Sequence, residues 1–319
     1  MRKTVWTIAF SAVLSVTGLF SSPALAAGGH TWQVQAGSVS FDGAGPSGGG
    51  NRFYPGAIAI HQGDSVTFRP MGAHTITFNR PPGPVFTLFG PSGDPTITSA
   101  TQQTNSGIIG GGPGAASYTL TFASTLPVGR YTVICGLHIG MTETIHILPP
   151  AAALPRNDTE YLAIAQKEIA RDLATEAEIA ADARDNNEDE DGSPSVLVGA
   201  GNKRVSNLRF FPAAVTVHVG QAVTFLKTQD PTEPHTVTFG TEVGDPLVAS
   251  IGSTYSGTEN ISSGFMSTRA QYAFYQLAGT PLPVALTKYK VTFTAVGDFQ
   301  YFCAIHDGIG MRGTVHVVR

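Results

Sequence analysis

Two similar stretches place the strongest constraint on what this chain can fold into. Each of them, 135–141 and 303–311, begins with one of the two cysteines of the chain, has a histidine three residues later and ends with a methionine. Two histidines, one cysteine and a distant methionine are the ligands of copper in an electron-transfer centre. Each stretch supplies all but one of these ligands, so the repeat predicts two metal centres.

The missing histidine comes from a second repeated phrase. His74 precedes Thr-Ile-Thr-Phe, and His235 precedes Thr-Val-Thr-Phe. A lone Cys near a His is more often a small buried apolar residue than a ligand. Two matching copies that use every cysteine of the chain favour the metal site. The two predicted ligand sets are His74, Cys135, His138 and Met141 in the first half, and His235, Cys303, His306 and Met311 in the second half.

Both halves resemble cupredoxins, the plastocyanin, amicyanin and azurin family of blue copper proteins. Besides the ligands, the resemblance rests on three pairs of segments: 52–55 and 209–212, 63–68 and 220–225, and the glycines six residues before each cysteine, Gly129 and Gly297. It implies an eight-stranded Greek-key sandwich in each half and one-electron transfer through a mononuclear copper. It also implies that His138 and His306 are the points where electrons enter and leave.

The length of 319 residues favours two domains. Segments such as 57–61 and 215–219 alternate with period two, as strands do. We expect an all-β protein: two tandem Greek-key cupredoxin sandwiches joined by a helical linker. The expected boundaries are 1–26 for a signal peptide, 27–150 for the first domain, 151–194 for a helical and acidic linker, and 195–319 for the second domain.

The N-terminal segment has the pattern of a secretory signal peptide. Arg2 and Lys3 precede an apolar run over 5–20, and small residues at Ala24 and Ala26 fit a cleavage site. The run is short for a membrane span, although an uncleaved membrane anchor is an alternative. We therefore expect export to the periplasm or the extracellular space. The net charge of −4 argues against a nucleic-acid partner.

The linker combines a helix with an acidic run. Asn157 and Glu160 fit a capping box, and strong helix formers continue to Arg184. Such a helix holds the domains apart, docks on a domain or pairs with another chain. The acidic run over 185–191 reads as a solvated hinge, with attraction of a basic redox partner as the alternative. The expected apolar stripe of the helix is narrow and consists of Leu162, Ile169, Leu173 and Ala180.

Each domain also carries a long insertion between its upstream histidine and its cysteine. The first, 79–116, is rich in Gly and Pro, and we expect solvated decoration rather than a lid over the copper. The second, 240–290, is rich in aromatic residues, for which the sandwich core is favoured over a partner-docking face. Its large apolar residues are Phe265, Met266, Tyr272, Phe274 and Tyr275.

The two sites differ in the length of the loop between the last histidine and the methionine, and in both a threonine follows the upstream histidine. Two residues separate the last His from Met in the first site, as in amicyanin, and four in the second, as in plastocyanin, which implies different reduction potentials. Thr75 and Thr236 follow the upstream histidines, where the family often has Asn. We expect their hydroxyls to brace the cysteine loops, because hydrogen bonds around the thiolate tune the potential.

The leading function is therefore an exported electron carrier with two type 1 copper ions, one per domain, and redox proteins as partners. A copper oxidase or nitrite reductase would need His-x-His and His-Cys-His phrases for an open metal site, and neither occurs. Copper storage or delivery would favour more than the five methionines present. Four further histidines should point outward from strands, with paired extra metal binding as the less favoured alternative: His61, His146, His218 and His316.

Overall fold

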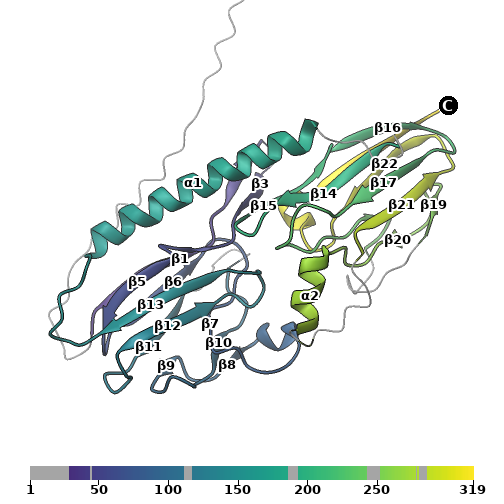
Figure 1. Cartoon of the computed structure of the whole chain (residues 1–319). Coiled ribbons are helices and arrows are strands. Elements are labelled where there is room, and N and C mark those ends of the chain that lie inside the picture. The colour runs from purple at the N-terminus through teal and green to yellow at the C-terminus, as the bar shows by residue number, and fades with distance from the viewer. Residues whose placement is uncertain are drawn as a thin grey trace, which may run out of the picture.

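The protein is described here by a computed structural model that covers residues 29–43, 45–110, 117–185, 193–242, 252–277, 279 and 286–319. Within these ranges two β-sandwiches lie side by side, and the long helix α1 (Asp158–Asp185) runs along both of them (Figure 1). The all-β architecture with a helix between the sandwiches confirms the expected fold class. The predicted signal peptide lies outside the described residues. None of the helices in the described ranges is both long and apolar enough to cross a bilayer.

The first sandwich consists of two sheets. One has the order β4 (Phe53–Tyr54), β1 (Thr31–Ala36), β6 (Ser65–Pro70), β11 (Tyr118–Phe122) and β9 (Thr96–Ile97). The other has the order β5 (Ala57–His61), β13 (Thr142–Leu148), β12 (Gly129–Ile134), β7 (Thr77–Phe78), β10 (Thr104–Ser106) and β8 (Pro91–Ser92).

The second sandwich repeats this strand order. One sheet has the order β19 (Thr254–Tyr255), β21 (Lys288–Phe293), β17 (Ala222–Leu226), β14 (Ser195–Gly201), β15 (Val205–Phe211), β3 (Gly45–Gly50) and β2 (Ser40–Asp42). The other has the order β16 (Ala214–His218), β23 (Arg312–Val318), β22 (Gly297–Phe302), β18 (Thr238–Phe239) and β20 (Ile261–Ser262). Both sandwiches have the same two parallel neighbours, β1 with β6 and β14 with β17 in one sheet, β5 with β13 and β16 with β23 in the other.

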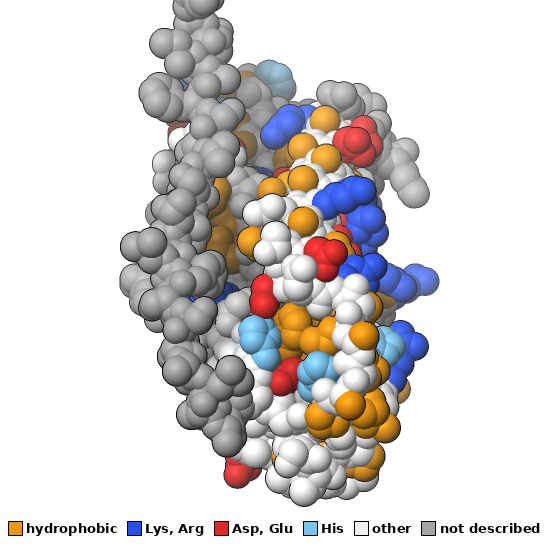
Figure 2. Space-filling view, turned by 90° about the vertical axis from the view of Figure 1, so that its left-hand side faces the viewer, with side chains coloured by type: hydrophobic (Ala, Val, Ile, Leu, Met, Phe, Trp, Pro, Cys, Tyr) orange, Lys and Arg blue, Asp and Glu red, His pale blue; other side chains and the backbone are white. Residues whose placement is uncertain are grey.

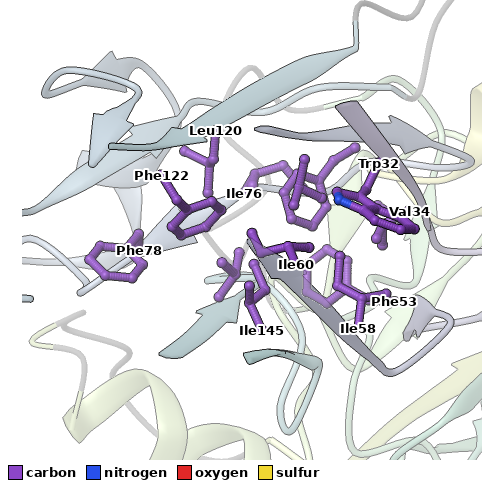
Figure 3. Close-up of a cluster of buried hydrophobic side chains, with 14 of the residues drawn as sticks. Trp32, Val34, Phe53, Ile58, Ile60, Ile76, Phe78, Leu120, Phe122 and Ile145 are labelled. Carbon is purple, nitrogen blue, oxygen red and sulfur yellow. The ribbon is translucent and has the colours of Figure 1, made fainter. Parts of the chain in front are cut away.

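Alternation along the strands builds the core of each sandwich. In β13, Ile145 and Ile147 are buried while His146 between them is partly exposed. Figure 3 shows how such side chains from opposite sheets of the first sandwich meet, with Trp32 at one end and Phe78 at the other. Burial of these side chains from water stabilises the sandwich and holds the loops at its end in place.

The hairpin of β2 and β3 connects the two sandwiches. The hairpin lies early in the first half of the chain. Even so, β3 pairs antiparallel with β15 and extends the sheet of the second sandwich. Gly48 allows this close approach, because a Cβ there would lie 2.1 Å from the carbonyl oxygen of Ser206 in β15, and a Cβ on Gly49 would lie 1.8 Å from the carbonyl oxygen of Ser38. The segment that forms β2 and β3 therefore belongs to the sheet of the second domain, and the chain returns to the first sandwich with β4.

Helix α1 begins as the sequence predicts. Asn157 Oδ1 accepts a hydrogen bond from the Glu160 amide (3.0 Å), and the Glu160 carboxylate accepts one from the Asn157 amide (2.8 Å), which is the expected capping box. The helix does not hold the domains apart; it docks on both. Tyr161 packs in the core of the first sandwich, and Ala180 and Ala183 pack against the second.

The predicted apolar stripe of α1 is only partly right. Leu162 is 58% exposed, whereas Asp172 and Glu176 lie on the buried face. Asp172 accepts hydrogen bonds from Tyr54 (3.0 Å) and from Arg52 (3.1 Å) of the first domain. The helix therefore docks through an ion pair and small side chains, which apolar periodicity alone does not reveal.

One described part of each insertion lies at the junction of the domains. The 3-10 turn η1 (Val85–Leu88) of the first insertion faces helix α2 (Arg269–Leu277) of the second. Figure 1 shows α2 between the two sandwiches. Of the aromatic-rich segment, Met266 joins the sandwich core as expected. Phe265, Tyr272, Phe274 and Tyr275 instead pack with Val85 and Leu137 of the first domain. Their large apolar surfaces are used between the domains, and the expected filling of the core is wrong for them.

Candidate metal centres

The sandwich brings the predicted ligands of the first site together from two places. Cys135 follows β12 directly, and Met141 directly precedes β13, so one loop carries Cys135, His138 and Met141. His74 comes from the neighbouring chain segment before β7, where it pairs with Ile109 in an isolated bridge. The Cys135 amide donates to the Met141 carbonyl (3.0 Å), which closes the loop.

Three side chains of the first site face a common point. Cys135 Sγ lies 3.3 Å from His138 Nδ1 and 3.9 Å from His74 Nδ1, and the two Nδ1 atoms are 3.1 Å apart. All three side chains are buried. Atoms separated in this way can each lie about 2.0–2.3 Å from one ion, as nitrogen and thiolate ligands do. Met141 is buried beside Cys135 in the core of the sandwich.

The second site repeats this geometry. Cys303 Sγ lies 3.5 Å from His306 Nδ1 and 3.8 Å from His235 Nδ1, and the two Nδ1 atoms are again 3.1 Å apart. Cys303 follows β22 and Met311 precedes β23; the 3-10 turn η2 (Asp307–Ile309) fills the longer loop between His306 and Met311. In the part of the chain that the structure describes, these two clusters are the groups of His, Cys and acidic residues that are placed to hold a metal ion.

The electrostatics of the clusters favour thiolates. Burial raises the pKa of Cys135, but the adjacent His138 and His74 outweigh it and hold the pKa of Cys135 well below its ordinary value. The pKa of Cys303 is lowered in the same way by His306, against the effect of burial. A thiolate is the form of cysteine that binds metal. The lowered pKa values therefore favour the metal-binding form of both cysteines.

The threonine hydroxyls brace the cysteine loops, as predicted. Thr75 Oγ1 accepts a hydrogen bond from the amide of Gly136, and Thr236 Oγ1 accepts one from the amide of Ala304, both at 2.7 Å. The backbone amides of the two threonines point at the sulfurs, at 3.4 Å from Cys135 and 3.3 Å from Cys303. Each threonine therefore fixes both the loop and the donor that faces the thiolate.

Two glycines leave room for the upstream histidines. A Cβ on Gly37 would lie 2.1 Å from His74 Nε2, and a Cβ on Gly199 would lie 2.3 Å from His235 Nε2. Both glycines also have positive φ, of 79° and 73°. Sequence reasoning missed them, although both are glycines near the end of the first strand of the equivalent sheets, Gly37 directly after β1 and Gly199 within β14.

The upstream rings are anchored differently in the two sites. His74 Nε2 lies 3.2 Å from the carbonyl of Met71. His235 Nε2 lies 3.4 Å from the carboxylate of Asp230, which is fully buried and pairs with the fully buried Lys227. Burial raises the pKa of Asp230, but the nearby Lys227 and His235 lower it by more, so the pKa lies below its ordinary value and the group is a carboxylate. The second site thus has a buried ion pair behind its histidine where the first has a neutral carbonyl.

The imidazole rings of the downstream histidines, His138 and His306, both contact Glu233. His138 Nε2 lies 2.7 Å from Glu233 Oε1, and His306 Nε2 lies 3.7 Å from Glu233 Oε2. Burial raises the pKa of Glu233, but His138 and His306 lower it to about 2. Sequence reasoning missed this residue, which lies two positions before His235. Its signal was a charge with no counterpart at the equivalent Gly72 of the first domain.

A cavity of about 920 Å³ opens beside this contact, between the domains. Its lining includes Glu233, the ligand candidates His138 and His306, and the apolar Phe86, Phe89 and Ile305. The ring edges expected to exchange electrons with partners therefore border the junction of the two domains.

The four histidines predicted to point outward from strands are partly exposed (His61, His146 and His316) or exposed (His218), as expected. Histidine side chains are visible on the outside of the first-domain end of the molecule (Figure 2). The strands that carry them are neighbours, but the rings bond elsewhere. His61 contacts the carbonyl of Ala152 (2.9 Å), and His316 contacts Asp298 (2.7 Å). The structure therefore does not support the paired extra metal site among the residues that it describes.

A family profile for copper-binding proteins, the plastocyanin/azurin family, matches residues 195–318. The second sandwich has the fold of a cupredoxin. The match covers the second cupredoxin domain, and the first domain repeats its strand order and its cluster of Cys and His.

Solved structures similar to this chain include single cupredoxins. A mutant fern plastocyanin shares 22% identity over 39% of this chain and 99% of its own, with a TM-score of 0.25. The oxidised plastocyanin of Dryopteris crassirhizoma shares 21% identity over 39% and 99% of the two chains, with a TM-score of 0.24. A mutant amicyanin in the Cu(I) form shares 22% identity over 41% and 87%, with a TM-score of 0.25. Among curated proteins, no relative matches the chain.

Proposed function

We propose that this chain is an exported electron-transfer protein with two type 1 copper centres, one in each cupredoxin domain. The observation that carries the proposal is the repeated cluster of one thiol and two imidazole Nδ1 atoms with a buried methionine beside it. Thiolate and imidazole ligands with a weak thioether suit copper that cycles between Cu(I) and Cu(II).

The residues of the chain have distinct roles in this proposal. His74, Cys135, His138 and Met141 would hold the first ion. His235, Cys303, His306 and Met311 would hold the second. Each set is carried on strand ends and short loops of a packed sandwich, which keeps the ligands in place and so reduces rearrangement during electron exchange. Burial of the clusters excludes water from the thiolates.

The proposal includes export because residues 1–26 have the pattern of a signal peptide. The two proposed domains follow, over 27–150 and 195–319. Redox proteins are the proposed partners. The two centres should differ in potential, because their loops differ in length and because His235 alone has the buried Asp230 behind it.

Copper stoichiometry and the visible spectrum of the mature protein test the proposal. We expect two copper ions and an intense blue thiolate-to-copper band, which decreases in part in Cys135→Ser and in part in Cys303→Ser. A titration should resolve two reduction steps. A single copper, or a band that one substitution abolishes, would refute two equivalent centres. Copper beyond two ions would favour a copper oxidoreductase, and rapid loss of copper to an acceptor protein would favour delivery.

A further inference from the structure

We propose that Glu233 joins the two centres into one intramolecular electron relay. The inference rests on the proposed function, because it assigns the path between the two proposed copper sites. Glu233 lies between the two clusters and contacts one histidine of each. The first domain has Gly72 at the equivalent position, so the link is made by one residue and is not a repeated feature of the fold.

The orientation of the two rings gives the link its direction. In both His138 and His306 the Nδ1 atom faces the cysteine sulfur of its own cluster, at 3.3 and 3.5 Å. The opposite ring atom, Nε2, is then free to carry hydrogen and to donate to an acceptor. The carboxylate of Glu233 offers one oxygen to each ring, at 2.7 and 3.7 Å. The path from one thiolate cluster to the other thus consists of a hydrogen bond between Glu233 and His138 and a longer ion-pair contact of 3.7 Å between Glu233 and His306.

A buried network positions Glu233. Asp230 Oδ1 accepts hydrogen bonds from the amides of Thr232 (2.9 Å) and Glu233 (3.2 Å), which fixes the turn that carries the carboxylate. Asn51 of the first domain donates to Thr232 Oγ1 (3.0 Å) and to Ser206 Oγ (2.9 Å). The turn of the second domain is therefore held directly against the first domain.

Further contacts hold the two domains in this arrangement. Arg209 of the second domain pairs with Asp42 through two hydrogen bonds of 2.9 and 3.1 Å. Tyr275 of α2 packs against Val85 of the first domain beside the bridge. The Glu233 side chain is 16% exposed and that of His138 only 5%. Limited access of water strengthens a charge-assisted hydrogen bond at this point.

The transfer is a single-electron exchange. One electron leaves the reduced centre and arrives at the oxidised centre, so one centre is oxidised and the other reduced, with no bond broken and no proton lost from the path. Electronic coupling falls less steeply through bonds and hydrogen bonds than through empty space. The carboxylate also places one negative charge beside both centres, which favours the more positive, oxidised state of each. The shorter contact makes this effect larger at the first centre.

The decisive experiment uses the full-length protein loaded with copper. One of the two centres is reduced by a brief light pulse in the presence of a photoreductant, and the redistribution of the electron is followed in the visible spectrum. We expect a rate that does not depend on protein concentration. In Glu233→Gln, whose single amide oxygen cannot serve both rings equally, this rate should fall by at least an order of magnitude while both blue bands remain. Both potentials should rise, and that of the first centre should rise more.

Glu178→Gln is the matched control. It removes the same charge from the exposed face of α1, and it should leave the rate and both potentials unchanged. An unchanged rate in Glu233→Gln would overturn the relay, and so would a rate in the unsubstituted protein that scales with its concentration.

A second measurement does not depend on copper. In the metal-free protein labelled with 15N, the hydrogen-bonded Nε2–H of His138 should give a protected imidazole signal that Glu233→Leu abolishes. Absence of that signal, or its persistence in Glu233→Leu, would show that the bridge does not exist. A protein that keeps the signal but binds no copper would refute the proposed function, and the relay with it, while the bridge itself would stand.

Discussion

Replacement of Gly37 by alanine tests how closely the first strand approaches the metal cluster. The added Cβ would lie 2.1 Å from His74 Nε2 and 2.4 Å from the carbonyl of Met71, both too close for any real contact. Gly37 also has φ of 79°, where a side chain is strained. The left-handed conformation costs about 1–2 kcal/mol. Crowding in a packed interior costs roughly 1–3 kcal/mol more.

We therefore expect Gly37→Ala to lower the free energy of unfolding of the first domain by about 2–5 kcal/mol. The assay is urea unfolding of the metal-free protein followed by fluorescence of Trp32, which is buried in the core of that domain. The copper-loaded variant should also show an altered band from the first centre, because relief of the contact requires His74 to move.

Gly63→Ala is the control. Gly63 has a similar φ of 91°, but the nearest atom to an added Cβ is 3.8 Å away. This variant should lose only the conformational part, about 1–2 kcal/mol, and keep its spectrum. Equal losses in Gly37→Ala and Gly63→Ala, with unchanged spectra in both, would refute the argument that Gly37 makes room for the histidine.

Two further predictions concern the cysteine loop of the first site and the docking of α1 on the first domain. Thr75→Ala should destabilise the first domain by about 1–3 kcal/mol, because the buried amide of Gly136 loses its acceptor, and Thr75→Ser should restore most of the loss in the same urea assay. Asp172→Ala should cost about 2–3 kcal/mol, below the value for a fully buried pair because the Arg52 side chain is 22% exposed. Calorimetry would detect the loss as a lower unfolding temperature, whereas Glu178→Gln on the same helix should change it little; equal effects of the two would contradict the docking role of Asp172.

The sequence reveals most of the interior of each domain. The repeated phrases predict which side chains gather, since a cysteine after one strand and a histidine before another meet whenever the sandwich forms. Thr75 and Thr236 could be assigned as braces for the same reason. Local pairing rules also predict the start of α1, because a capping box uses residues only three positions apart.

The same local rules do not predict the contacts between the domains. Glu233 is an ordinary loop carboxylate until the second domain turns it toward His138, 95 residues earlier in the chain. The buried face of α1 contains Asp172, which periodicity assigns to solvent; only its partners Arg52 and Tyr54 explain its burial. The aromatic residues of α2 fit a core equally well by composition. In each case the partner lies on another element or domain, and the sequence does not say which residues meet when these dock.

The hairpin of β2 and β3 has a consequence for the order in which the molecule can form. Gly50 pairs with Val205, so an early strand stays without its partner until the start of the second domain has been made. A strand edge left open in this way is prone to pair with another chain. Conversely, removal of the first domain would uncover β15 at the edge of the second sheet. The two halves resemble one another, yet the sheet of the second half is extended by a hairpin from the first, so separate fragments should associate with other chains more readily than the intact chain.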